Sequence, residues 1–154
     1  FDSRQALLIQ SMEDVADRFI QSYREQAMLL RQQHKEDLMV ALHALRNVVS
    51  SREQIAWFEV QQAARTDQAL CQAFRPVFLR NQEENVALGR ALFPDTLAKL
   101  PMNEQLIQLL ILMFHGQTLD AHIEQNPDKE QEMLALATTL GQLGISFVLQ
   151  DQTD

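Results

Sequence analysis

The sequence predicts an all-α fold, an antiparallel bundle of about six helices. Only four Gly and four Pro occur among the 154 residues, so there is little material for turns. Residues that favour helices dominate the remainder, and no segment alternates apolar and polar residues for long enough to form a strand pair. With 46% apolar residues, the chain has enough material for the core of one domain spanning residues 1–154.

The first helix is expected to begin at Asp2, whose carboxylate can cap free backbone N–H groups while Gln5 reaches back. Apolar residues then recur at steps of three, four or seven residues, which predicts one apolar stripe over about 28 residues. The stripe comprises Leu8, Met12, Val15, Phe19, Tyr23 and Leu30. The polar run 31–35 ends this helix.

A second helix carries four regularly spaced apolar residues and is broken at Ser50. Ser51 and Gln54 form a capping pair that opens a third helix. Two sides of the third helix are apolar, which predicts that neighbouring helices enclose it. One side holds Ile55, Phe58 and Ala63, and the other holds Trp57, Val60 and Ala64.

A fourth helix is expected to start at Thr66 and Asp67 and to end before Pro94. Pro76 lies inside this helical pattern. It removes one backbone hydrogen bond, so it must kink the helix unless the first turns form a separate short helix.

The last two helices are rich in apolar residues. Asn103 is expected to cap the fifth, in which all positions from Leu106 to Phe114 except Gln108 are apolar, and such density predicts burial against more than one layer. Pro127 opens the sixth, whose apolar residues alternate steps of three and four, as in the narrow seam between near-parallel helices.

One explanation covers both helices, namely that they pair with their symmetry mates in a four-helix dimer interface, where Gly141 and Gly144 permit close approach. The alternative is packing within one chain. The residues expected at the interface are Leu112, His115, Leu119, His122, Met133, Leu136, Leu140, Leu143, Gly144 and Phe147.

Charge and composition exclude several classes of protein. The formal net charge is −8 and no basic run occurs, so this chain by itself is expected to bind nucleic acid poorly. A single Cys cannot form an internal disulfide, which favours the cytoplasm. The longest apolar run, 109–114, is too short to span a membrane, so a soluble protein is expected.

The candidate ligand-binding residues are polar groups within apolar stripes and the aromatic residues of four helices. Counting by helical steps from Phe74 places Asn81 and Asn85 on the inward side of the fourth helix. Their amides then contact either a ligand or neighbouring helices, and the aromatic residues serve either a pocket or the core. The set is Phe19, Tyr23, Trp57, Phe58, Gln61, Phe74, Phe78, Asn81, Asn85, Phe114 and Gln117.

Catalysis, metals and cofactors find no support in the sequence. His115 and His122 lie seven residues apart, or about 10 Å along a helix, which is too far for both to hold one metal ion. No nucleophile–base pair, glycine-rich phosphate loop or metal-ligand spacing occurs. The chain is therefore expected not to be an enzyme and to need no cofactor.

Three stretches resemble the TetR family of bacterial transcriptional regulators. The opening Phe1-Asp2-Ser3-Arg4-Gln5-Ala6-Leu7-Leu8 looks like the junction that follows the recognition helix in that family, with Arg and Gln where Lys and Glu are usual. The stretch 63–70 (AARTDQAL) resembles the family's Ala-Arg-x-Asp-x-x-Leu segment. The stretch 112–119 (LMFHGQTL) is similar to its Asp-Gly-x-x-Leu segment, with His115 in place of the acidic residue.

The resemblance implies the C-terminal regulatory domain of a TetR-like regulator, which would act as a repressor that a small, largely apolar effector releases from DNA. Residues 1–31 would be the long helix that follows an N-terminal helix-turn-helix. The chain begins with Phe1 instead of Met, so we expect that part to be missing here, and with it the contacts to DNA. A free-standing helical module that binds a partner helix is the alternative function.

Overall fold

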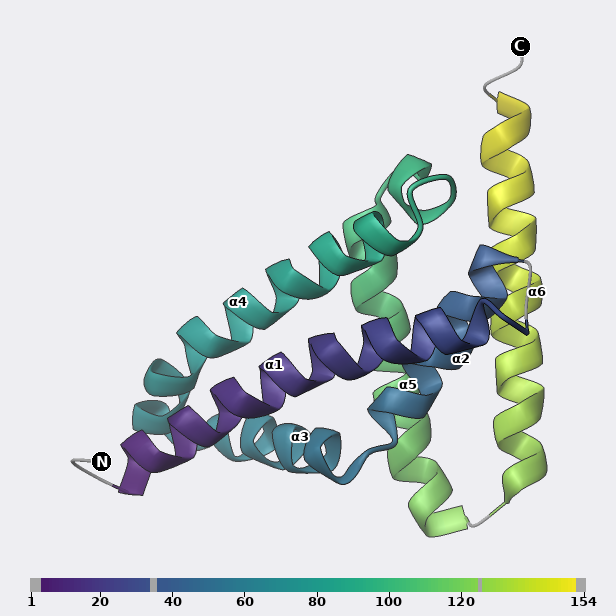
Figure 1. The fold of residues 1–154 in the computed structure, drawn as a ribbon. Helices are drawn as coiled ribbons and strands as arrows, with labels where there is room; N and C mark the ends of the chain where they lie inside the picture. The colour runs from purple at the N-terminus through teal and green to yellow at the C-terminus, as the bar shows by residue number, and fades with distance from the viewer. Residues whose placement is uncertain (1–3, 34–35, 125, 152–154) are drawn as a thin grey trace.

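The computed structural model describes residues 4–33, 36–124 and 126–151, and over these ranges the fold is all-α, without strands, as predicted (Figure 1). A short 3₁₀ turn, η1 (Leu97–Lys99), joins the fourth and fifth helices. The six helices are α1 (Arg4–Leu30), α2 (Asp37–Val49), α3 (Arg52–Ala64), α4 (Gln68–Leu92), α5 (Asn103–Glu124) and α6 (Pro127–Asp151).

Helix α1 crosses the molecule and packs mainly against α2 and α4 (Figure 1). Its predicted start at Asp2 lies outside the described residues, but its end at Leu30 agrees with the polar run that follows. Four residues of the predicted stripe are buried, while Leu8 and Leu30 are half-buried. The buried residues of α1 are Met12, Val15, Ala16, Phe19, Tyr23 and Ala27.

Side-chain caps set the starts of α3 and α4. Ser51 Oγ accepts a hydrogen bond from the backbone N–H of Gln54 at 3.3 Å, and Asp67 Oδ1 accepts one from that of Leu70 at 3.0 Å. Both caps satisfy N–H groups that have no partner within the helix. Helix α4 continues through Pro76, so its first turns are not a separate helix.

Two expectations about the helices are wrong. Helix α3 is not enclosed on two sides, because it lies at the outside of the bundle and leaves Ile55 and Ala63 exposed (Figure 1). Asn103 does not cap α5 with its side-chain oxygen. Its Oδ1 accepts a hydrogen bond from Arg90 at 2.7 Å, and its Nδ2 donates to the carbonyl of Leu100 at 3.0 Å.

The core consists of two apolar clusters. The larger cluster joins the second half of α1 to α2, α5 and α6, around Phe93 and Phe114. The smaller cluster joins the first half of α1 to α3 and α4, around Trp57 and Phe74. The bundle is therefore packed as two connected regions, which share α1 and α4 as common walls.

Helices α5 and α6 run antiparallel, and α6 forms one edge of the molecule (Figure 1). The burial against several layers that was predicted for α5 is incomplete, since Leu109 and Leu112 are exposed. Gly141 contacts α2 within the chain, because a Cβ atom there would lie 2.8 Å from Leu38 Cδ2. Gly144 has no such neighbour.

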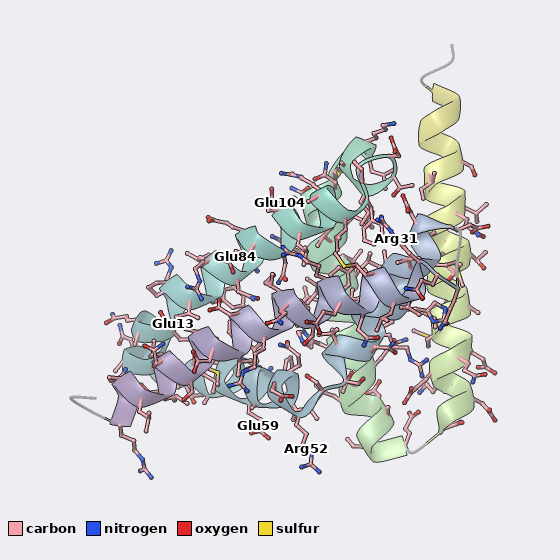
Figure 2. The ribbon with its side chains drawn as sticks, viewed as in Figure 1. Glu13, Arg31, Arg52, Glu59, Glu84 and Glu104 are labelled. Carbon is pink, nitrogen blue, oxygen red and sulfur yellow. The ribbon has the colours of Figure 1, made fainter. Side chains whose placement is uncertain are left out.

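Charged side chains lie mainly on the outer surface. Figure 2 shows Arg52 and Glu59 projecting from α3 away from the other helices, and both residues are exposed. Of the described helices, none is long and apolar enough to cross a membrane.

Candidate functional site

A cavity of about 80 Å³ lies where the two apolar clusters meet, between α1, α3, α4 and α5. Phe19 comes to it from the larger cluster and Trp57 from the smaller one. The residues that line it are Phe19, Gln54, Trp57, Gln61, Phe78, Asn81, Gln82, Asn85, Gln108, Ile111, Leu112 and His115.

Buried polar side chains converge on this cavity. Among the described residues, the buried polar ones are Gln54, Asn81 and His115, and all three line it. They come from α3, α4 and α5. Because a buried polar group without a partner costs about 1–3 kcal/mol, such convergence in one place is typical of a site built for a ligand or for bound water.

Aromatic rings form the apolar wall of the cavity. Trp57 meets Phe74 edge to face with ring centroids 4.9 Å apart, and it stacks on Phe78 at 6.4 Å. Phe74 lies behind these rings in the smaller cluster and does not line the cavity. The wall is therefore held in place by contacts that continue into the core.

His115 comes to the cavity from α5, with its ring centroid 5.7 Å from that of Phe58. Burial lowers the pKa of this histidine, so its imidazole is neutral at pH 7. Its Nε2 is buried and has no hydrogen-bond partner. A neutral imidazole can offer either a donor or an acceptor at that atom, according to its tautomer.

The structure brings together six of the eleven residues predicted to bind a ligand: Phe19, Trp57, Gln61, Phe78, Asn81 and Asn85. It places three others differently. Tyr23 donates from its hydroxyl to the carbonyl of Ala41 at 3.2 Å, which satisfies its polar group within the core. Phe74 is a core residue, and Phe58 contacts His115 without lining the cavity.

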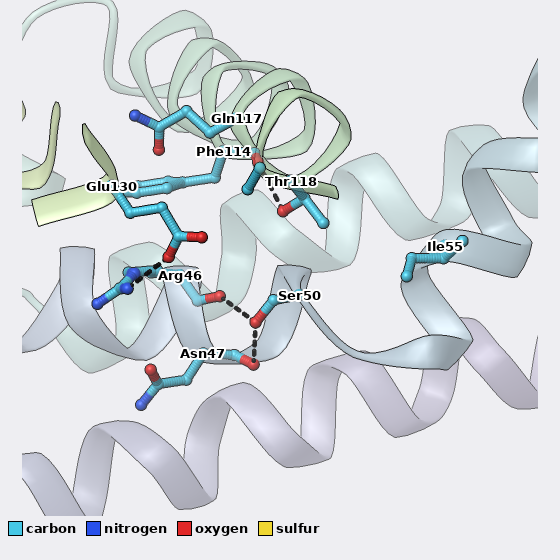
Figure 3. A pocket seen from close by; sticks show the side chains of 9 residues that line it. Arg46, Asn47, Ser50, Ile55, Phe114, Gln117, Thr118 and Glu130 are labelled. Carbon is cyan, nitrogen blue, oxygen red and sulfur yellow. Dashed lines mark hydrogen bonds and ion pairs between the residues drawn. The ribbon is translucent and has the colours of Figure 1, made fainter. Parts of the chain in front are cut away.

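The remaining two predicted residues, Phe114 and Gln117, line a separate and more polar cavity of about 370 Å³ between α2, α3, α5 and α6 (Figure 3). An ion pair between Arg46 and Glu130, 2.6 Å apart, forms part of its wall. Gln117 Nε2 is buried without a partner. Eight of the eleven predicted ligand residues therefore divide between two cavities that lie on different sides of α5.

A third cavity is an apolar groove of about 460 Å³ lined by α2, η1, α5 and α6. Leu140 and Gly144, both predicted at a dimer interface, lie along it. Gln105 is the single polar residue among those that line it. This groove has no buried polar side chain to orient a small polar ligand.

The predicted interface residues differ in their exposure. Six are exposed: Leu112, Leu119, Leu136, Leu140, Leu143 and Gly144. Met133 is half-buried, and the side chains of His122 and Phe147 lie outside those that the structure describes. His115 is a correction, because it is only 8% exposed and faces the cavity instead of the outer surface.

Sequence reasoning missed four residues that line the first cavity: Gln54, Gln82, Gln108 and Ile111. The sequence pattern identifies Gln54 only as a partner in the cap of α3. The cap uses the backbone N–H of Gln54, and its side chain is buried inside the protein. Gln108 carried a usable signal, since it is the one polar residue within the apolar run of α5.

Nothing in the described part of the chain forms a cluster of three or more potential metal-ligating residues. No protein-family model matches the sequence, and comparisons with curated proteins and with solved structures give no significant match.

Proposed function

We propose that this chain is the effector-binding and dimerisation domain of a TetR-like transcriptional regulator. The observation that carries the proposal is the convergence of Gln54, Asn81 and His115 on one cavity beside α1. The order and lengths of the helices, together with the resemblance at residues 1–8, 63–70 and 112–119, support it. In such a regulator a separate helix-turn-helix binds the operator, and the effector releases a repressor from DNA.

The position of Phe19 suggests how the effector acts. Phe19 belongs to α1 and forms part of the cavity wall. The cavity of about 80 Å³ is smaller than the cavity of about 150 Å³ that accepts benzene in a protein core. A ring-sized effector must therefore displace part of the wall, and a shift of α1 would be carried along its 27 residues, or about 40 Å.

Dimerisation is proposed for the outer face of α5 and α6. Leu112 on α5 and Leu140 on α6 are each 59% exposed, and Leu119, Leu136 and Leu143 are also exposed. Exposed apolar side chains on two neighbouring helices are typical of a protein–protein interface, since their burial removes the cost of hydrating apolar groups. A symmetric pair would bury the same face of each chain.

Trp57 provides a direct test of effector binding. It is the one Trp of the sequence and it lines the cavity, so its fluorescence reports on that site alone. A library of small apolar and aromatic molecules is titrated into the protein, and we expect at least one to change the emission in a saturable way. Asn85→Leu should weaken that ligand, whereas Gln62→Leu, at an exposed position of α3 outside the cavity, should not. Unchanged affinity in Asn85→Leu would contradict the assigned site.

Sedimentation tests the dimer. The chain is expected to sediment as a dimer at concentrations on the order of 10–100 µM, and Leu140→Glu is expected to shift it to a monomer because it places a charge in the apolar face. Leu79→Glu is the matched control, since Leu79 is an exposed leucine that belongs to α4 and not to the proposed interface helices. A wild-type monomer at these concentrations would count against the whole proposal.

The apolar groove of about 460 Å³ favours a second candidate function, a module that receives the apolar face of a partner helix. The two functions differ in their requirements. A groove-binding module can be a monomer and needs no ligand in the cavity beside His115, whereas the regulatory domain requires both the dimer and the ligand.

A further inference from the structure

The walls of the cavity beside His115 have a distinctive composition. Six of the twelve residues that line it carry a carboxamide, and none of the twelve carries a formal charge at neutral pH. Charged residues make up 22% of the sequence, so this cavity is markedly poorer in charge than the chain as a whole. The carboxamides belong to Gln54, Gln61, Asn81, Gln82, Asn85 and Gln108.

The missing charge restricts what can bind. A carboxylate or an ammonium group that enters the cavity gives up hydration, and no opposite charge on the lining residues replaces it. His115 supplies no compensating charge, because its burial favours the neutral imidazole. The cavity therefore selects against ions of either sign.

The carboxamides nevertheless favour a polar ligand. Each of them presents a carbonyl oxygen that accepts and an amino group that donates two hydrogen bonds. Asn85 uses one of its two N–H bonds to reach Asn81 Oδ1 at 3.0 Å, and its second N–H is not used in that bond. His115 Nε2 adds a buried polar atom that has no partner. A ligand with both a donor and an acceptor can satisfy these groups together.

The aromatic wall adds a preference for flat molecules. Trp57 and Phe78 contribute to the wall two nearly parallel rings with centroids 6.4 Å apart, and a planar ring packs favourably against aromatic side chains. Asn and Gln side chains recognise a neighbouring donor and acceptor on the edge of such a ring through two hydrogen bonds, as they do with adenine. The aromatic rings therefore favour a flat ligand, and the carboxamides favour one that carries a donor and an acceptor on its edge.

We propose that the cavity binds an uncharged, planar ring molecule whose edge carries an amide or a similar pair of donor and acceptor groups. This ligand class rests on the sensing function proposed above. Gln61, Gln82 and Gln108 are only half-buried, so their flexible side chains can swing aside and enlarge the cavity for a single ring.

Four single-ring probes of similar size separate the possible classes. Benzamide is neutral with a donor and an acceptor, toluene is apolar, benzoate is an anion and benzylammonium is a cation. Each is titrated into the full chain to about 5 mM, a range suited to ligands with few heavy atoms, while the emission of Trp57 is followed. Saturation distinguishes binding from collisional quenching, and thermal unfolding provides a second readout.

Benzamide is expected to bind at least about tenfold more tightly than each of the other three probes, because a site that hydrogen-bonds its ligand rejects analogues without the matching groups. It should also raise the melting temperature the most.

Variants then tie the preference to the carboxamides. Gln61→Leu should weaken benzamide by at least about threefold while leaving toluene unchanged or tighter. Gln62→Leu, the next residue on α3, is exposed and does not line the cavity, so it should bind both probes as wild type does. Asn81→Leu should act as Gln61→Leu does, provided that its circular dichroism shows a folded protein.

Two kinds of result overturn the proposal, and they differ in what they imply for sensing. If toluene, benzoate or benzylammonium saturates the Trp57 signal at least as tightly as benzamide, the ligand class is wrong while the cavity remains a binding site. If none of the four probes gives a saturable change, the cavity does not take a ring-sized molecule, and the class and the proposed sensing role fail together.

Discussion

Asn85 Nδ2 donates a hydrogen bond to Asn81 Oδ1 at 3.0 Å, one turn earlier on α4. Asn81 is buried and Asn85 is half-buried, and both line the cavity between the two apolar clusters. The bond fixes the direction of the Asn81 carboxamide and uses its acceptor. Water can reach Asn85 more easily than Asn81, so loss of the hydrogen bond costs more at Asn81 than at Asn85.

This inequality predicts an order of stabilities. Asn85→Leu leaves Asn81 Oδ1 buried without its donor and is expected to lower the free energy of unfolding by about 1–3 kcal/mol. Adding Asn81→Leu removes the orphaned acceptor, so the double variant should be more stable than Asn85→Leu alone. Urea unfolding followed by circular dichroism measures all four proteins of this double-mutant cycle. If the loss of stability in the double variant equalled the sum of the losses in the two single variants, the bond would not couple the two residues.

His115 predicts a pH dependence of stability. Burial lowers its pKa in the folded state, so between the usual value of about 6.5 and the lowered value the unfolded chain binds more protons than the folded chain. The stability that this histidine contributes is therefore present above about pH 6.5 and is lost as the pH falls toward the lowered pKa.

His115→Gln removes that titration. Its melting temperature should fall less than that of the wild type between about pH 7.5 and pH 5.5, a range above the pKa values of most carboxylates. Thermal unfolding at several pH values gives the two profiles. Parallel profiles would mean that His115 takes up its proton equally in both states.

The sequence predicted the parts of the fold that depend on neighbouring residues along the chain. Ser51 and Asp67 were each expected at the start of a helix, and the structure confirms both starts. Each side chain accepts a hydrogen bond from the backbone N–H three residues later, so the signal is local in the sequence. The inward direction of Asn81 and Asn85 follows from helical periodicity within α4 alone, and the structure places both at the cavity.

The parts that sequence reasoning missed depend on which helices pack together. His115 lies on α5, whose apolar residues cover all sides of the helix, so periodicity does not show which way the His115 side chain points. Its contact with Phe58 of α3 depends on how the helices pack together. The apolar run in α5 likewise does not distinguish burial within one chain from burial by a second chain. Leu109 and Leu112, which belong to this run, are exposed.

The ion pair between Arg46 and Glu130 predicts a small contribution to stability. Its side chains are 34% and 37% exposed, so solvent screens the attraction, although the pair joins α2 to α6 at 2.6 Å. Glu130→Gln should lower the free energy of unfolding by no more than about 1 kcal/mol, and by less at high salt. Asp95→Asn, which breaks the more exposed pair with Lys99, is the control and should cost less. A loss above about 2 kcal/mol for Glu130→Gln would mean that the pair is far better shielded than its exposure indicates.

Gly141 and Gly144 lie on the same helix, but replacing each by Ala is expected to change the free energy of unfolding in opposite directions. Replacing Gly by Ala within a helix gains about 0.5–1 kcal/mol, because Ala loses less conformational freedom on folding. Gly144 has no neighbour within 4 Å of an added Cβ atom, so Gly144→Ala should raise the free energy of unfolding by about that amount.

At Gly141 the added Cβ atom would lie 2.8 Å from Leu38 Cδ2, and Leu38 is buried. Its side chain must shift within a packed core, at a cost of about 1–3 kcal/mol, so Gly141→Ala should be destabilising in spite of the helical gain. Urea unfolding of the two variants measures the difference. If Gly141→Ala were as stable as Gly144→Ala, α6 would not pack against α2 at this position, and the wall of the apolar groove would have to lie elsewhere.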